Sequence, residues 1–125
     1  MRLNVRQSYL AMFDFLNKIY YEIKDDCMDD DFVSLLSGFN PYLFTDGMPA
    51  DPAAWGDWKN AVNIITKEKL LTSAETLCAT IGFIKFHNDE FGFKLQWLIN
   101  RLDLVSAENP EWQECIFKAM TAPLT

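Results

Sequence analysis

Apolar residues recur at spacings of three and four along most of this 125-residue chain, and this period constrains the fold more than any other feature. Apolar side chains at that spacing share one face of an α-helix, whereas a half-buried strand alternates at a spacing of two. No segment alternates in that way over more than a few residues. The clearest helical stripe lies in residues 5–25 and consists of Val5, Tyr9, Met12, Phe13, Leu16, Ile19, Tyr20 and Ile23.

Helix start signals divide the rest of the chain. Asp51-Pro52 and Asn109-Pro110 each place a capping side chain before a proline, which is the combination preferred at helix N-termini. Thr72 and Glu75 have the spacing of a capping box. Together with a short helix at 30–37 and a break at Gly92, these signals predict an all-α fold. We expect five or six helices around one core, forming a single helical domain over residues 1–125.

The connections between these helices are also predicted from turn-forming residues. Residues 38–50 are expected to form a loop, because Asn40-Pro41 and Asp46-Gly47 favour turns. Gly38 is placed for a left-handed cap at the end of the second helix. Residues 67–71 are expected to form a polar connector.

Cysteine usage gives no sign of a disulfide framework or of a zinc site. The chain has three cysteines far apart in sequence, and none belongs to a Cys-x-x-Cys pair. Cys78 and Cys115 fall on apolar helix faces, so we expect both to be buried thiols of the core.

Bulk composition favours a folded protein that is retained in the cytoplasm. Half of the residues are hydrophobic, which is enough for a packed core. No apolar run approaches the ~18 residues needed to span a bilayer, and the first residues lack the apolar region of a signal peptide. We therefore expect no contact with a membrane.

The negative charge of the chain is concentrated in one stretch. Residues 22–57 contain nine acidic residues and one basic residue and so net −8, while the whole chain nets −7, which leaves +1 for all other residues. Such a segment repels nucleic acid and attracts a basic protein. Basic residues are also too few and too scattered to form a nucleic-acid interface.

Few residues are placed for catalysis, so we expect a protein that is not an enzyme and needs no cofactor. The single histidine, His87, has no second histidine or cysteine at ligand spacing, and a helix-end structural role is expected for it. The aspartates of residues 25–31 lack the alternating oxygens, central glycine and terminal glutamate of a calcium loop. No phosphate-binding glycine loop and no nucleophile elbow is present.

Residues 46–58 read Asp-Gly-Met-Pro-Ala-Asp-Pro-Ala-Ala-Trp-Gly-Asp-Trp, and they follow Tyr20-Tyr21 and Leu35-Leu36-Ser37. This pattern resembles a family of small acidic bacterial proteins of the immunity type, which are associated with polymorphic and contact-dependent toxin systems. The resemblance covers roughly residues 9–62. It implies a protein that binds and neutralises a cognate toxin, and it brings no catalytic residue.

The leading hypothesis is therefore an immunity-like protein that binds a basic partner, such as a toxin domain, through its acidic segment. Aromatic side chains beside the carboxylates would anchor the partner. Two alternatives remain open, namely a structural or regulatory helical interaction module and an enzyme that uses paired carboxylates. The residues expected to contact the partner are Asp25, Asp26, Asp29, Asp30, Asp31, Tyr42, Phe44, Asp46, Trp55 and Asp57.

Overall fold

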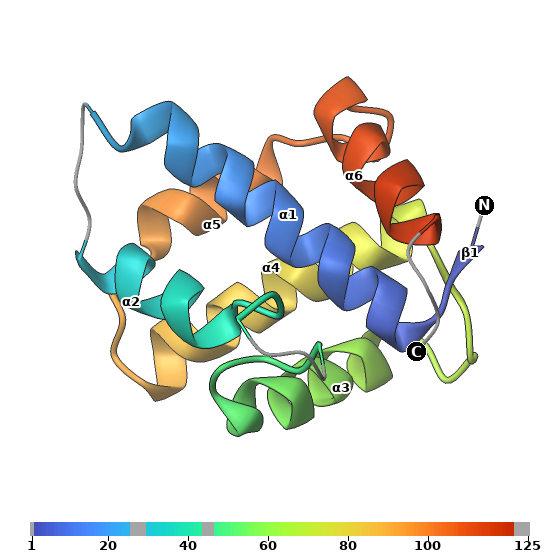
Figure 1. Cartoon of the computed structure of the whole chain (residues 1–125), viewed down its shortest axis with the longest axis horizontal. Coiled ribbons are helices and arrows are strands. Elements are labelled where there is room, and N and C mark those ends of the chain that lie inside the picture. The colour runs from blue at the N-terminus through green and yellow to red at the C-terminus, as the bar shows by residue number, and fades with distance from the viewer. Residues whose placement is uncertain (1, 26–29, 44–46, 122–125) are drawn as a thin grey trace.

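The structure is a computed structural model that describes residues 2–25, 30–43 and 47–121. The described residues form six helices and one small antiparallel sheet (Figure 1), so the prediction of an all-α bundle is confirmed. The helices are α1 (Val5–Ile23), α2 (Asp30–Phe39), α3 (Pro52–Ile65), α4 (Ser73–Glu90), α5 (Gln96–Asp103) and α6 (Pro110–Met120), and the strands are β1 (Arg2–Leu3) and β2 (Leu71–Thr72).

The predicted start signals have the expected geometry. The Asp51 carboxylate accepts the Ala53 amide ahead of α3, and the Asn109 side chain accepts two amides at the start of α6. Thr72 and Glu75 form a complete capping box at α4. Gly92 adopts φ 72° between α4 and α5, a conformation that favours glycine, so these two helices are separate.

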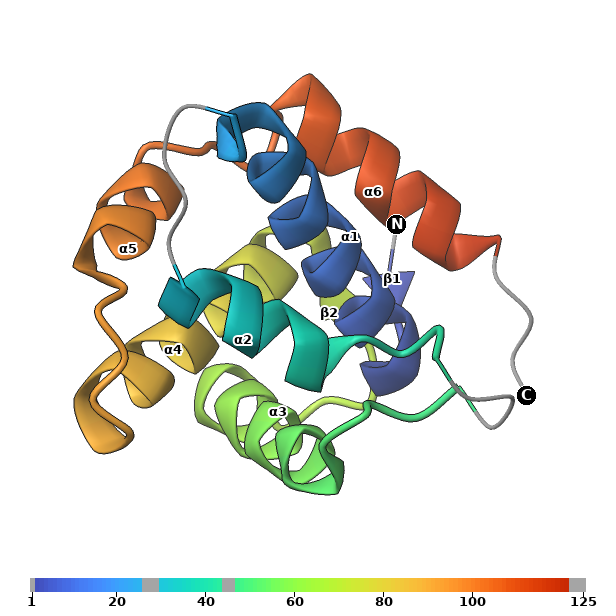
Figure 2. The same ribbon diagram turned by 60° about the vertical axis from the view of Figure 1, so that its left-hand side comes forward.

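Helix α1 forms the centre of the core. It packs against α6, which lies beside it in both views (Figure 1 and Figure 2), and it also contacts α2, α3 and α4. In Figure 1 α4 passes behind α1 while α3 lies below it. Two fully buried tryptophans fill the interior around it, and each indole N–H finds an acceptor. Trp58 donates to the Ser8 hydroxyl at 3.2 Å, and Trp112 donates to the Ser73 hydroxyl at 3.1 Å.

Three boundaries differ from the predictions. Helix α2 continues to Phe39, so Gly38 lies inside the helix and adopts no left-handed conformation. The expected polar connector ends in β2, where Leu71 is fully buried and pairs with Leu3. Helix α1 ends at Ile23 rather than near residue 25. Strand β2 was not predicted because a two-residue strand is too short to produce an alternating pattern in the sequence.

The prediction for Cys78 was wrong, since this thiol is exposed, whereas that for Cys115 is confirmed. The buried face of α4 passes through Thr76, Thr80 and Phe83 instead. Both threonine hydroxyls donate to the carbonyl four residues earlier, at 2.9 Å, which satisfies them without water. A hydrophobicity pattern counts these two threonines as polar. It therefore predicts the wrong buried face for α4 and places Cys78 on it.

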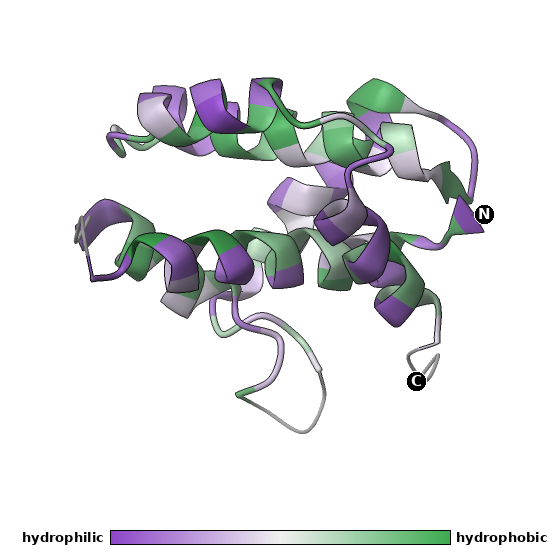
Figure 3. Cartoon of the chain, turned by 90° about the horizontal axis from the view of Figure 1, so that it is seen from above, coloured by the Kyte–Doolittle hydropathy of each residue, from purple (hydrophilic) through white to green (hydrophobic). Residues whose placement is uncertain are grey.

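Two contacts hold the connection between α2 and α3 against α1. The Tyr9 hydroxyl donates to the Phe39 carbonyl at 2.5 Å, and the Arg6 guanidinium donates to the Gly47 carbonyl at 2.8 Å. Gly47 adopts φ 68°, a conformation that favours glycine, and a Cβ there would lie 2.0 Å from an Arg6 nitrogen. The described parts of the connection, residues 40–43 and 47–51, lie on one side of the helical layers (Figure 3).

No helix in the described ranges is both long and apolar enough to traverse a lipid bilayer.

Candidate partner-binding surface

The described carboxylates of the acidic segment differ in their surroundings, because some are exposed and others contact a neighbouring residue. Asp25 follows α1 and Asp30 begins α2, and both are exposed. Asp31 accepts the Lys94 amide at 2.8 Å, which joins the start of α2 to the segment before α5. Asp57 faces His87 from α3. Asp25 and Asp30, which are exposed, and Asp57, which is partly exposed, therefore remain accessible to a partner.

Four of the residues expected to contact a partner lie outside the described residues. They are Asp26, Asp29, Phe44 and Asp46.

Among the described residues of the expected set, Tyr42 is the exposed aromatic one. Its side chain is 57% exposed, and the neighbouring Leu43 is 60% exposed. The Tyr42 hydroxyl nevertheless donates to the Asp14 carboxylate at 2.9 Å, and its ring meets the ring of Phe13 edge-on at 5.9 Å. The ring is thus both accessible and held in one orientation, as a binding anchor requires.

Asp14 lies at the centre of a polar group of residues between α1 and α6. Burial raises the pKa of its carboxyl, although the Tyr42 hydroxyl and two lysines act in the opposite direction. Lys118 approaches one carboxylate oxygen at 3.8 Å, and Lys18 pairs with Glu114 at 3.5 Å. A carboxylate that stays buried among donors is a feature of functional sites as well as of structural networks. The sequence places Asp14 one helical turn before Lys18, but it does not show that Tyr42 and Lys118 approach the Asp14 carboxylate.

The chemistry available beside Asp14 is limited. A pocket of about 200 Å³ is lined by Asp14, Lys18, Glu114 and Cys115, among others. Burial raises the pKa of the Cys115 thiol to about 12, so the thiol stays protonated and is a poor nucleophile at neutral pH. Burial and the Asp14 carboxylate raise the pKa of Tyr42 as well. The Cys115 thiol and the Tyr42 hydroxyl therefore both keep their protons at neutral pH.

The motif at residues 46–58 is largely explained by the fold. Its aspartate at position 51 caps α3, and Trp58 is buried against Ser8. Trp55, which we expected to anchor a partner, is half-buried and packs edge-on against Tyr9 at 5.8 Å. Its other face lies under the Lys59 ammonium, 5.8 Å from the ring centroid. Trp55 therefore offers a partner less surface than Tyr42 does.

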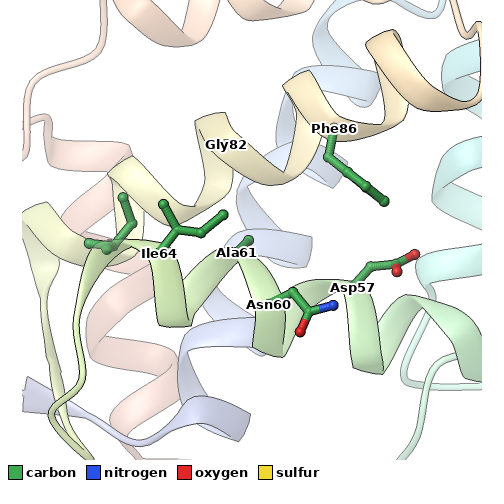
Figure 4. Close-up of a pocket in the computed structure, with 7 residues that line it drawn as sticks. Asp57, Asn60, Ala61, Ile64, Gly82 and Phe86 are labelled. Carbon is green, nitrogen blue, oxygen red and sulfur yellow. The ribbon is translucent and has the colours of Figure 1, made fainter.

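Asp57 is the residue of this motif that faces both a core histidine and open space. One carboxylate oxygen lies 3.8 Å from the His87 Nε2 atom, and the Asp57 side chain is 21% exposed. It lines a pocket of about 160 Å³ between α3 and α4 (Figure 4). His87 is buried among aromatic rings, and its Nδ1 atom lies 2.9 Å from the Phe83 carbonyl oxygen. His87 is thus positioned by its contact with Phe83, because 3.8 Å is too long for a hydrogen bond to Asp57.

Metal binding finds no support in the geometry of the described residues. In residues 2–25, 30–43 and 47–121 no three histidine, cysteine, aspartate or glutamate side chains lie close enough together to hold an ion.

Comparisons of the chain with protein-family models, with curated proteins and with solved structures found no match. A proposal for its function therefore depends on the residues described above and on the motif at residues 46–58.

Proposed function

We propose that this protein is a non-catalytic, immunity-like protein that binds a basic toxin domain and neutralises it. Tyr42 is the central contact, and the carboxylates at the α1–α2 connection attract the partner. The motif at residues 46–58 is the reason for placing the protein in the immunity class. Its retention in the cytoplasm, where such a toxin would act, is part of the same proposal.

The single observation that carries this proposal is the state of Tyr42. Tyrosine is enriched among the residues that dominate binding energy, because its large ring loses little conformational entropy on contact. Exposure alone is ordinary for a tyrosine, but Tyr42 combines 57% exposure with a hydroxyl that is bonded to Asp14. The hydrogen bond to Asp14 fixes this exposed ring before any partner arrives, which lowers the entropic cost of binding.

The distribution of charge supports a basic partner. Asp25 and Asp30 are exposed, and neither has a basic side chain within 4.0 Å among the described residues. Glu22 lies in the same segment but is already paired with Arg101. Unpaired surface carboxylates of one sign speed up the encounter with an oppositely charged protein and contribute less to the final affinity.

The experiment measures binding to the basic domain encoded by the gene adjacent to the one for this chain. The double variant Asp25→Lys/Asp30→Lys is expected to lower the association rate constant about tenfold at low salt, within the range for electrostatic steering. The loss should shrink as salt is added, because salt screens exposed charges. Asp103→Lys is the matched control, since Asp103 is exposed on α5 and lies outside the acidic segment.

Two results would count against the proposal. One is that no basic toxin domain binds the protein. The other is that the double variant and the control have the same association rate constant as the original protein.

A further inference from the structure

The groove between α3 and α4 is bordered by apolar side chains that face solvent. Ile64 is 83% exposed, and the Phe86 ring is 39% exposed and leans toward the part of α3 that carries Asp57 (Figure 4). Phe91 extends this surface beyond the pocket, because its ring is 57% exposed and contacts Phe86 edge-on at 5.5 Å. Single exposed apolar residues are ordinary, but several that adjoin one groove indicate a site of interaction.

Gly82 keeps the groove open. It lies within α4, and a Cβ at this position would have no heavy atom within 4 Å. A glycine inside a helix costs about 1 kcal/mol relative to alanine. No neighbouring atom comes so close to position 82 that the fold would require a glycine there. The absence of a side chain leaves a space of about 160 Å³, comparable to the ~150 Å³ apolar cavity that binds benzene.

One end of the groove carries the Asp57 carboxylate, which is partly exposed and has His87 as its neighbour. A carbonyl can only accept, so His87 Nδ1 donates its hydrogen to the Phe83 carbonyl at 2.9 Å. The Nε2 atom on the other side of the ring lies 3.8 Å from a carboxylate oxygen of Asp57, which is too far for a hydrogen bond. No lysine or arginine nitrogen lies within 4.0 Å of this carboxylate in the described part of the chain.

We propose that the α3–α4 groove binds a segment of the basic partner that carries one bulky apolar side chain next to a lysine or arginine. The apolar side chain fills the space above Gly82, and the cation pairs with Asp57. A second copy of this chain is the poorer occupant, because each copy carries a net charge of −7. This inference rests on the proposed function for the basic character of the partner, and it adds a second contact surface besides Tyr42.

The test uses the blocked peptide acetyl-Ala-Phe-Arg-Ala-amide as the probe. Methyl spectra of isoleucine-labelled protein follow Ile64 and Ile65, which both line the groove. We expect saturable shifts of these methyl signals at millimolar peptide. The same peptide with glutamate in place of arginine should bind at least threefold more weakly, as should the original peptide with the Asp57→Asn variant.

Gly82→Leu fills the groove with a side chain and should abolish the shifts. Gly56→Leu is the matched control, because Gly56 is also a helical glycine with open space around it and lies outside the groove. The inference is overturned if the peptide does not bind, if its charge has no effect, or if Gly82→Leu binds like Gly56→Leu. If the toxin domain binds Gly82→Leu as tightly as the original protein, the proposed function stands and the groove is excluded from the interface.

Discussion

Replacing Tyr9 with phenylalanine removes one buried hydrogen bond between α1 and the end of α2. The Tyr9 side chain is 2% exposed, and its hydroxyl donates to the Phe39 carbonyl at 2.5 Å. The variant leaves that carbonyl without its donor in a place that water does not reach, and it changes the packing by only one oxygen atom. A buried polar group without a partner costs about 1–3 kcal/mol.

We expect Tyr9→Phe to lower the free energy of unfolding by about 2 kcal/mol. A domain of this size is stable by roughly 5–15 kcal/mol, so the variant still folds. With a urea m-value of about 2 kcal/mol/M, the unfolding midpoint should fall by about 1 M at unchanged m. The assay is urea unfolding followed by tryptophan fluorescence, since two of the four tryptophans are fully buried in the core.

Tyr21→Phe is the matched control, because Tyr21 is 60% exposed. A change at that position should stay within about 0.5 kcal/mol, as for most surface substitutions. If the two variants unfold at the same urea concentration, the Tyr9 hydroxyl forms no buried bond. The account of how α2 and the following loop are held against α1 would then be wrong.

Four further predictions concern stability. Gly47→Ala should lower the free energy of unfolding by about 1–3 kcal/mol in urea melts, because φ at this position is 68° and the new Cβ would meet Arg6. Gly82→Ala should raise it by about 1 kcal/mol, which a thermal melt shows as an increase of a few degrees. Asp14→Asn should raise it at pH 7 but not at pH 3, because burial raises the pKa of the carboxyl and so disfavours its charged form in the fold. The urea midpoint should fall as pH rises from about 8.5 toward 12, because the unfolded chain releases the Cys115 proton at its ordinary pKa while the folded chain holds it up to about 12.

The helix starts could be predicted from the sequence because capping is local. Asp51 and Thr72 act on amides two or three residues away, so their spacing alone specifies the hydrogen bonds. The break at Gly92 could be predicted for the same reason, because it depends on the conformation of that one residue.

The buried face of α4 could not be predicted from hydrophobicity alone. The hydroxyl groups of Thr76 and Thr80 donate to backbone carbonyls, which allows both side chains to be buried. Whether they are buried depends on which other elements pack against α4. Cys78 was consequently placed in the core although it is exposed.

The contacts that hold the residues of the candidate surface could not be predicted from the sequence. Tyr42 was expected to contact a partner, but its bond to Asp14 joins residues that are 28 positions apart in the chain. The approach of Asp57 to His87 likewise joins α3 to α4. Such pairs follow from helix packing, which leaves no pattern in a single sequence.

The claim that Tyr42 anchors a toxin is tested most directly by a neutralisation assay. The activity of the purified basic toxin domain is measured while this protein, its Tyr42→Ala variant or its Tyr21→Ala variant is added. We expect stoichiometric inhibition by the original protein and by Tyr21→Ala, which alters another exposed tyrosine. Tyr42→Ala should require at least about 30-fold more protein, as for the loss of a contact worth about 2 kcal/mol. Equal inhibition by both variants, or no inhibition by the original protein, would contradict the claim.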